Sequence, residues 1–396
     1  MNRNPTLPAS PPHAPEVSSR ERLQAALDHR ESDRVPFDLG ATKMTGIAIG
    51  GYRRLLAQLD WTALDPSPEL MDRIQQLAVV PEPVLRQLGV DTRGVFPLGT
   101  PVEERAGLDA FFDEWRIGWR RPDRDGLYFD VDESPLPGEP EDGGIEGYRM
   151  PQGAADRRFG GMEERIGGLD IQGMGIVLNG FTSGAMEMVT RIRGYQEAMV
   201  DLALEPERVA YLLDGIVEQK MHYWTRALGI AGGRAQVAVE VDDLGTQQGL
   251  LFSRDLYRSV LMPRHRRLFE HIHRTSPGIR VFLHSCGAVR EVIPDLIEAG
   301  VDILNPVQTS AAGMDAAGLK RDFGKHLVFW GGGVDTQRIL PFGTPEEVRE
   351  DVKRRIDILA PGGGFVFSSI HNIQSDVPPA NLEALFETLH TFGKAH

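Results

Sequence analysis

From about residue 170 onward, short runs of β-branched and apolar residues alternate with stretches that carry a helical pattern. This order is typical of a parallel sheet with helices outside it, because successive parallel strands need a long crossover connection. Two earlier runs bring the number of expected strands to about eight, which favours a closed barrel over an open, doubly wound sheet. The expected strands are 34–39, 92–96, 175–179, 236–241, 279–284, 302–305, 327–330 and 365–368. We therefore predict an α/β fold of the (β/α)8 TIM-barrel class.

One helix is clearly marked near the C-terminus. Thr344-Pro-Glu-Glu347 has the pattern of a capping box with proline at the first helical position. An apolar stripe with helical spacing follows, at Val348, Val352, Ile356 and Leu359. We expect this stripe to pack against the sheet or a neighbouring helix.

One stretch, roughly 100–165, breaks the rhythm of strands and helices. It is rich in Gly, Pro, Asp and Glu, and we predict a β-hairpin-rich insertion there. Long insertions after barrel strands usually lie over the C-terminal mouth of the barrel. Trp115, Trp119 and Tyr128 are therefore candidates to face a substrate, although packing of the insertion onto the barrel would explain them equally well.

Composition and length limit the other possibilities. We expect a disordered, proline-rich tail over residues 1–18 and a single domain over 19–396. The net charge of −14 argues against nucleic-acid or anionic-membrane partners, and no apolar run approaches the roughly 20 residues that span a bilayer. A single cysteine excludes an intrachain disulfide and fits a reducing compartment, so we expect a cytoplasmic protein.

The only cysteine of the chain, Cys286, follows His284 by two residues where a predicted strand ends. An imidazole and a thiolate on one tight turn can begin a zinc site. Other potential ligands stand at comparable strand ends. They are Glu240, Asp242 and Asp243, after the run that begins at Gln236, and His371, after the last predicted strand. The alternative is a buried, hydrogen-bonded histidine beside a small apolar cysteine.

Further polar residues also stand at predicted strand ends. They are Asn179, Asn305, Gln308 and Asp335, with Gln247 and Gln374 of similar standing. The C-terminal ends of barrel strands collect catalytic and binding residues, so each could belong to a site. Each could equally be a cap of a loop.

Five segments carry a resemblance to a known family. They are 34–40 (RVPFDLG), 242–247 (DDLGTQ), 284–287 (HSCG), 330–336 (WGGGVDT) and 371–381 (HNIQSDVPPAN). With them the chain resembles the uroporphyrinogen decarboxylase superfamily over most of residues 20–395, and its cobalamin-dependent methyltransferase branch more closely than the porphyrin decarboxylases.

The resemblance to the decarboxylase branch fails at two places. The decarboxylases have an arginine-rich segment soon after the first strand, whereas this chain has Gly40-Ala-Thr-Lys-Met-Thr-Gly46. They also need an aspartate after the second strand, and the matching stretch, 95–99 (VFPLG), has none. The many carboxylates of a porphyrinogen would find few partners here, and unpaired charges are costly to bury.

The methyltransferase branch implies zinc held by a His-x-Cys pair and a later cysteine. His284 and Cys286 match the pair, and His371 stands where the later cysteine is expected. For a fourth ligand we prefer Glu240, with Asp242 and Asp243 as alternatives. Strand alternation puts Val237, Val239 and Val241 on one face and Glu240 with Asp242 on the other.

The expected function is that of an O-demethylating methyltransferase. Zinc would activate a methoxylated donor, which we expect to be aromatic, and the methyl group would pass to the cobalamin (corrinoid) of a partner protein. We expect catalytic roles for Asp242, Asp243, Asn305 and Gln308 and cofactor contacts from Asn179 and Asp335. A homodimer is a candidate assembly. The alternatives are a metal-free lyase that decarboxylates a smaller acid and a non-catalytic protein that binds a small aromatic compound.

Overall fold

The computed structural model describes residues 17–122, 128–138 and 144–394. Most of the predicted tail, residues 1–16, lies outside the described residues. Ser18, the last residue of that tail, already belongs to the fold, because its hydroxyl accepts a hydrogen bond from Glu21 N and caps helix α1.

The main sheet has seven strands in the order β13-β12-β11-β10-β9-β8-β3. The pairings between β8 and β9, β9 and β10, and β12 and β13 are parallel. The strands are β3 (Thr92–Val95), β8 (Gly175–Asn179), β9 (Val237–Val241), β10 (Arg280–His284), β11 (Ile303–Asn305), β12 (Val328–Trp330) and β13 (Phe365–Val366). Each coincides with one of the predicted runs.

The first predicted strand, 34–39, lies between the segments of β13 and β3 but pairs with them only at Phe37. Phe37 forms a parallel bridge with Phe367, just beyond β13, and its carbonyl accepts a hydrogen bond of 2.8 Å from Asp91 N, just before β3. The segment is thus bonded on both sides but is too short to count as a strand. Pro36 contributes to this, because it has no N–H to donate. The fold is of the TIM-barrel type, as the sequence predicted.

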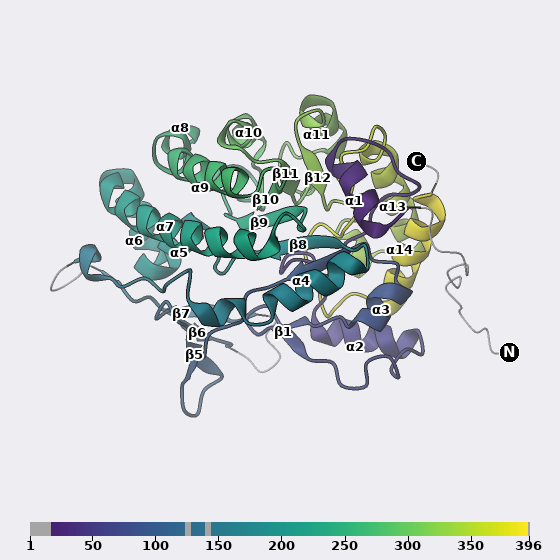
Figure 1. Ribbon diagram of the computed structural model, residues 1–396, viewed down its shortest axis with the longest axis horizontal. Coiled ribbons are helices and arrows are strands. Elements are labelled where there is room, and N and C mark those ends of the chain that lie inside the picture. Colours follow the sequence, from purple (N-terminus) through teal and green to yellow (C-terminus); the bar gives the residue numbers. More distant parts are fainter. Residues whose placement is uncertain (1–16, 123–127, 139–143, 395–396) are drawn as a thin grey trace. The chain divides into compact units, whose positions relative to one another are not determined.

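Helices follow the strands along the chain (Figure 1). They are α1 (Ser19–Leu27), α2 (Ile49–Gln58), α3 (Glu82–Gln87), α4 (Met162–Ile171), α5 (Ala185–Arg193), α6 (Tyr195–Leu204), α7 (Pro206–Ala231), α8 (Arg254–Leu256), α9 (Met262–Thr275), α10 (Ile293–Ala299), α11 (Ala316–Phe323), α12 (Ile339–Phe342), α13 (Pro345–Leu359) and α14 (Pro379–Phe392). The capping box predicted at Thr344 is present at α13, and the apolar stripe that follows it is buried. Of the helices in the described part of the chain, none combines the length and apolar character needed to cross a bilayer.

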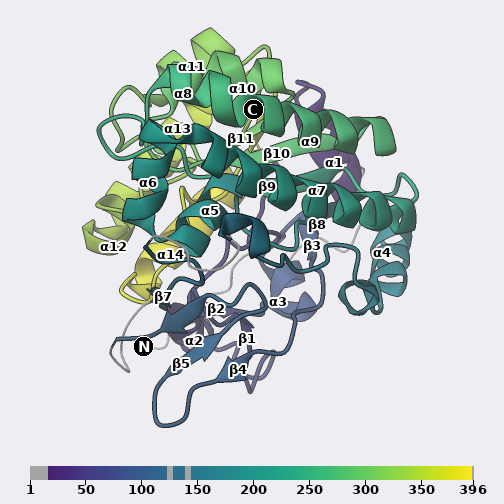
Figure 2. The ribbon, with the colours of Figure 1, turned by 90° about the vertical axis from the view of Figure 1, so that its left-hand side faces the viewer.

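The predicted insertion forms an antiparallel sheet, β4-β5-β6-β7 (Figure 2). Its strands are β4 (Glu103–Glu104), β5 (Ala110–Phe112), β6 (Gly118–Arg120) and β7 (Asp130–Glu133), and a separate ribbon pairs β1 (Leu70–Asp72) with β2 (Leu77–Ala78). Trp115 is buried and stacks on Phe181 at a centroid distance of 6.1 Å. Trp119 is also buried, whereas Tyr128 is half-buried. Packing therefore accounts for Trp115.

The packing divides the chain into two compact units. One consists of residues 1–94, 169–176 and 304–396, and the other of residues 95–168 and 177–303. The second contains the antiparallel insertion, strands β9 and β10, and helices α5 to α10.

Candidate metal centre

The loops that follow β9 and β10 are hydrogen-bonded to each other. The strands pair in register up to Val241 opposite His284. Beyond that point Asp242 N donates to the His284 carbonyl at 2.8 Å, and Leu244 N donates to Ser285 Oγ at 3.1 Å. These bonds fix the turn that carries His284 and Cys286 relative to the turn that carries Asp242 and Asp243.

Two glycines allow this close approach. Gly287 has a φ of +92°, and a Cβ added to it would lie 2.5 Å from the backbone of Gly245. A Cβ added to Gly245 would lie 2.9 Å from Cys286 O. Any larger residue would push the two loops apart, so both positions require glycine.

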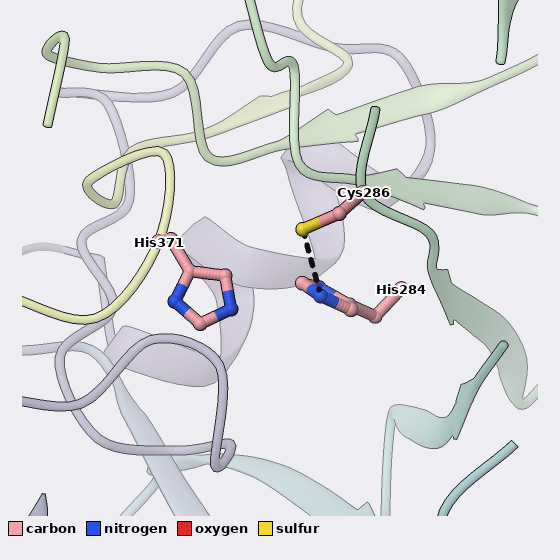
Figure 3. Close-up of side chains that lie close together, drawn as sticks. All are labelled: His284, Cys286 and His371. Carbon is pink, nitrogen blue, oxygen red and sulfur yellow. Dashed lines mark hydrogen bonds between the residues drawn. The ribbon is translucent and has the colours of Figure 1, made fainter. Parts of the chain in front are cut away.

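His284, Cys286 and His371 converge at this point (Figure 3). Cys286 Sγ lies 3.3 Å from His284 Nε2, and the ligand atoms of all three residues lie within 4.8 Å of one another. In a tetrahedral zinc site with bonds of about 2.0–2.3 Å, neighbouring ligand atoms lie roughly 3.5 Å apart. A thiolate with two imidazoles also suits zinc in softness. The three residues therefore fit a zinc ion.

Asp243 stands beside this group. Its Oδ1 accepts a hydrogen bond of 2.7 Å from Cys286 N and lies 3.9 Å from His284 Nε2. Burial, together with the charges of Asp243 and Glu187, raises the pKa of the Cys286 thiol well above its usual value. Burial and the nearby Asp242 also raise the pKa of the Asp243 carboxyl. A divalent cation would relieve this accumulation of negative charge.

Glu240, the acidic ligand preferred from the sequence, is bonded to helix α7. Its Oε2 lies 2.6 Å from Lys220 Nζ, and its Oε1 accepts a 2.6 Å hydrogen bond from Trp224 Nε1. All three side chains are buried, and both partners come from α7. Both oxygens of Glu240 are thus engaged with this helix, and its expected role as a metal ligand remains a prediction.

Asp242, for which a catalytic role is expected from the sequence, makes its described contacts within the fold. Its carboxylate accepts hydrogen bonds from Met186 N and Glu187 N at 3.0 and 3.1 Å, which caps the N-terminus of α5. His265 Nε2 lies 3.0 Å from the same carboxylate, and His265 Nδ1 lies 3.3 Å from Tyr257 Oη. This fully buried network holds α5 against β9.

Two of the other predicted site residues are tied to nearby backbone. Asn305 is fully buried and donates through Nδ2 to Trp330 O at 2.8 Å. Asp335, expected to contact the cofactor, accepts hydrogen bonds through Oδ1 from Gln337 N and Arg338 N, so it caps the turn before α12. These contacts are those of a loop cap, the alternative that the sequence also allowed, and the expected cofactor contact of Asp335 remains a prediction.

Asn179 and Gln308 are buried at the ends of strands. The Asn179 carbonyl accepts a 2.6 Å hydrogen bond from Tyr223 Oη, and its side chain makes long contacts of 3.5 Å to backbone oxygens. Gln308 lies in the loop after β11. The contacts described for these two residues are with the protein itself, and their expected roles remain predictions.

The sequence reasoning missed two residues of α5, Glu187 and Arg191. They form an ion pair of 3.0 Å and, with Asp243, line a cavity of about 460 Å³. Arg191 also lies over the Trp119 ring, with its Cζ 5.3 Å from the ring centroid. The sequence does contain a sign of this pair, because an acidic residue and an arginine stand four residues apart soon after the strand predicted at 175–179.

The barrel fold and the candidate metal centre together define a TIM-barrel protein whose strand ends carry side chains that could hold a metal ion. The chain belongs to the uroporphyrinogen decarboxylase (URO-D) family, because the sequence model of that family matches residues 145–392. It is 25% identical over 385 residues to the uroporphyrinogen decarboxylase of Alkalilimnicola ehrlichii, covering 94% of each chain. It is 26% identical over 190 residues to the enzyme of Psychromonas ingrahamii, covering 47% of this chain and 49% of that one.

Among solved structures, the chain is similar to a methyltransferase from Methanosarcina mazei. The TM-score is 0.62 at 17% sequence identity, and the match covers 95% of this chain and 99% of that one. At this identity the likeness shows a shared fold along nearly the whole of both chains.

Proposed function

We propose that this protein is a zinc-dependent methyltransferase that moves a methyl group from a methoxylated aromatic compound to the corrinoid of a partner protein. The observation that carries the proposal is the convergence of His284, Cys286 and His371, whose ligand atoms lie within 4.8 Å of one another. The match in fold to the Methanosarcina mazei methyltransferase supports it.

The segment where the decarboxylases carry arginines argues against a porphyrinogen substrate. Lys43 is the only cationic residue between Gly40 and Gly46, and its Nζ pairs with Asp72 at 2.8 Å. Thr42 and Thr45 are buried, with their hydroxyls 3.0 Å apart. This segment offers no free cation to a substrate with many carboxylates.

The three proposed ligands determine the character of the centre. When bound by His284, Cys286 and His371, zinc would supply a Lewis acid for the oxygen of the methoxy group. One thiolate and two neutral imidazoles carry less negative charge than the two-cysteine set that the family resemblance implies. His371 therefore keeps the centre electrophilic, which suits the cleavage of a methyl ether.

The residues around the ligands hold and enclose this centre. Asp243 orients the Cys286 backbone through the 2.7 Å hydrogen bond, and Gly245 and Gly287 allow the two loops to meet. The cavity beside Asp243 provides room for a small donor.

One observation favours a second candidate, a metal-free lyase that decarboxylates a smaller carboxylic acid. The curated relatives are decarboxylases, and one of them matches along 94% of this chain. In that case Asp243, whose carboxyl pKa is raised by burial, would hold a proton for the product.

The proposal is tested by mixing purified protein, cob(I)alamin and para-methoxybenzoate and recording methylcobalamin by its absorbance. We expect methylcobalamin only when zinc, donor and protein are all present, and its loss in Cys286→Ser. Formation at the same rate by metal-free protein would contradict the proposal. Carbon dioxide release from small acids without metal would instead establish the lyase.

A further inference from the structure

The cavity beside the candidate metal centre has a mixed lining. It has a volume of about 460 Å³, which is within the usual range for small-molecule sites. Its apolar lining comes from β7, α5, α6 and the loop after β9. The apolar residues are Val131, Met186, Tyr195, Met199 and Leu251. Methionine side chains adapt their shape and make favourable contacts with aromatic rings, so this lining suits a flat ring.

Four charged residues line the cavity, and they are Asp132, Glu187, Arg191 and Asp243. Asp132 is paired with Arg105 and Arg120 at 2.8 and 2.9 Å. Asp243 accepts the Cys286 N–H. Among the described residues of the lining, Arg191 is the only cation, and one of its terminal nitrogens pairs with Glu187.

Arg191 is held in a defined orientation. One of its terminal nitrogens donates to Glu187 Oε1 at 3.0 Å, and the other donates to Ser183 Oγ. The guanidinium lies over Trp119, which is itself fixed by a 2.8 Å hydrogen bond from Nε1 to Asp113 Oδ2. Arginine has five N–H donors in a planar fork, so stacking on a ring leaves further in-plane donors for a carboxylate.

We infer that Arg191 is a specificity-determining residue that binds a carboxylate, so that the donor is a methoxylated aromatic acid. The ring would lie against Met186 and Met199. Asp243 lines the same cavity, and its Oδ1 is 3.9 Å from His284 Nε2, so the cavity adjoins the candidate metal centre. The assignment of the methoxy group rests on the proposed function, whereas the carboxylate-binding site does not.

Calorimetric titration of zinc-loaded protein tests this inference with four probes: benzoate, para-methoxybenzoate, methoxybenzene and para-methoxybenzylamine. We expect both benzoates to bind at least about 10-fold more tightly than methoxybenzene, because a hydrogen-bonded ion pair adds to the ring contacts. In Arg191→Met, affinity for the benzoates should fall roughly 10- to 100-fold while that for methoxybenzene changes little. Arg191→Lys keeps the positive charge but lacks the planar fork of donors, so its affinity for the benzoates should lie between those of wild type and Arg191→Met.

Two controls keep the result interpretable. Arg208 is also ion-paired, with Glu205 at 2.8 Å, but it is not part of the cavity lining. The variant Arg208→Gln should therefore bind the benzoates like wild type. Circular dichroism and zinc content should be unchanged in Arg191→Met and Arg191→Lys. Benzoate binding that is equal in wild type and Arg191→Met, or a preference of wild type for methoxybenzene or para-methoxybenzylamine, would overturn the inference.

The same experiment separates this inference from the proposed function, because benzoate has no methyl group to transfer. If benzoate binding depends on Arg191 but no methylcobalamin forms, the carboxylate site stands and the methyl-transfer proposal fails. If methoxybenzene and para-methoxybenzoate donate methyl groups equally well, the proposed function stands and the role of Arg191 is refuted.

Discussion

Asp243 accepts a 2.7 Å hydrogen bond from the backbone N–H of Cys286, and the same oxygen lies 3.9 Å from His284 Nε2. The Asp243 carboxylate thus positions Cys286 and lies close to the imidazole ring of His284. Asp243 rather than Glu240 is the acidic residue that the structure places beside the candidate metal centre.

Asp243→Asn should weaken zinc binding by roughly 10-fold, a typical loss when a residue that supports metal ligands is changed. The asparagine oxygen can still accept the Cys286 N–H, so the loop should keep its shape. Competition with a chromophoric chelator measures the affinity. Asp335→Asn, which alters a carboxylate that caps a turn before α12, is the control and should bind zinc like wild type. If Asp243→Asn bound zinc with the affinity of wild type, Asp243 would have no role in the metal centre.

Gly287→Ala should lower the free energy of unfolding by roughly 2–4 kcal/mol, because the new Cβ adds a backbone clash to the strain of a positive φ. Gly362→Ala is a matched control, because Gly362 has a φ of +74° and nothing within 4 Å of an added Cβ. It should lose only about 1–2 kcal/mol. Denaturant unfolding gives both values. Equal losses would mean that the approach of Gly287 to Gly245 is not tight.

Glu240→Gln should destabilise the protein by roughly 3–5 kcal/mol, because it leaves the Lys220 ammonium buried without its partner. Folded Glu240→Gln should still bind one zinc ion with the affinity of wild type. The double variant Lys220→Met with Glu240→Leu should recover much of the stability, because it removes both buried charges. A loss of zinc from folded Glu240→Gln would restore Glu240 as a ligand.

The sequence could predict the barrel class, the insertion, the capping box of α13 and the three residues that converge, because these depend on local patterns and on strand ends meeting at one edge of a sheet. The sequence could not predict the contacts of Glu240. Strand alternation correctly separates Glu240 from the valines of β9, but only tertiary packing decides that Glu240 meets α7. Glu187 and Arg191 were missed for a similar reason, since Asp242, distant in sequence, fixes the start of α5.

Lys320 gives a pH dependence that is independent of any metal. Burial lowers the pKa of Lys320 to about 8, and its ammonium donates to Leu359 O and Gly363 O. The unfolded chain, with a lysine pKa of about 10.4, then binds more protons than the folded chain between these two values, so this lysine's contribution to stability rises as pH increases through that range and is smallest below pH 8. The unfolding free energy of wild type should therefore rise relative to that of Lys320→Met.

Lys353→Met is the control for this pH dependence, because Lys353 is exposed on α13. Denaturant unfolding at several pH values from 7 to 10.5 provides the comparison. A constant difference between wild type and Lys320→Met across this range would contradict the lowered pKa.

X-ray absorption at the zinc edge of the purified protein tests the central claim, that His284, Cys286 and His371 hold zinc, most directly. We expect about one zinc ion per chain with one sulfur neighbour at about 2.3 Å and nitrogen or oxygen neighbours at about 2.0–2.2 Å. In His371→Cys the sulfur contribution should double, which would assign that position to the centre. A zinc ion without a sulfur neighbour, an unchanged spectrum in His371→Cys, or protein that binds no zinc would show that these three residues do not hold zinc.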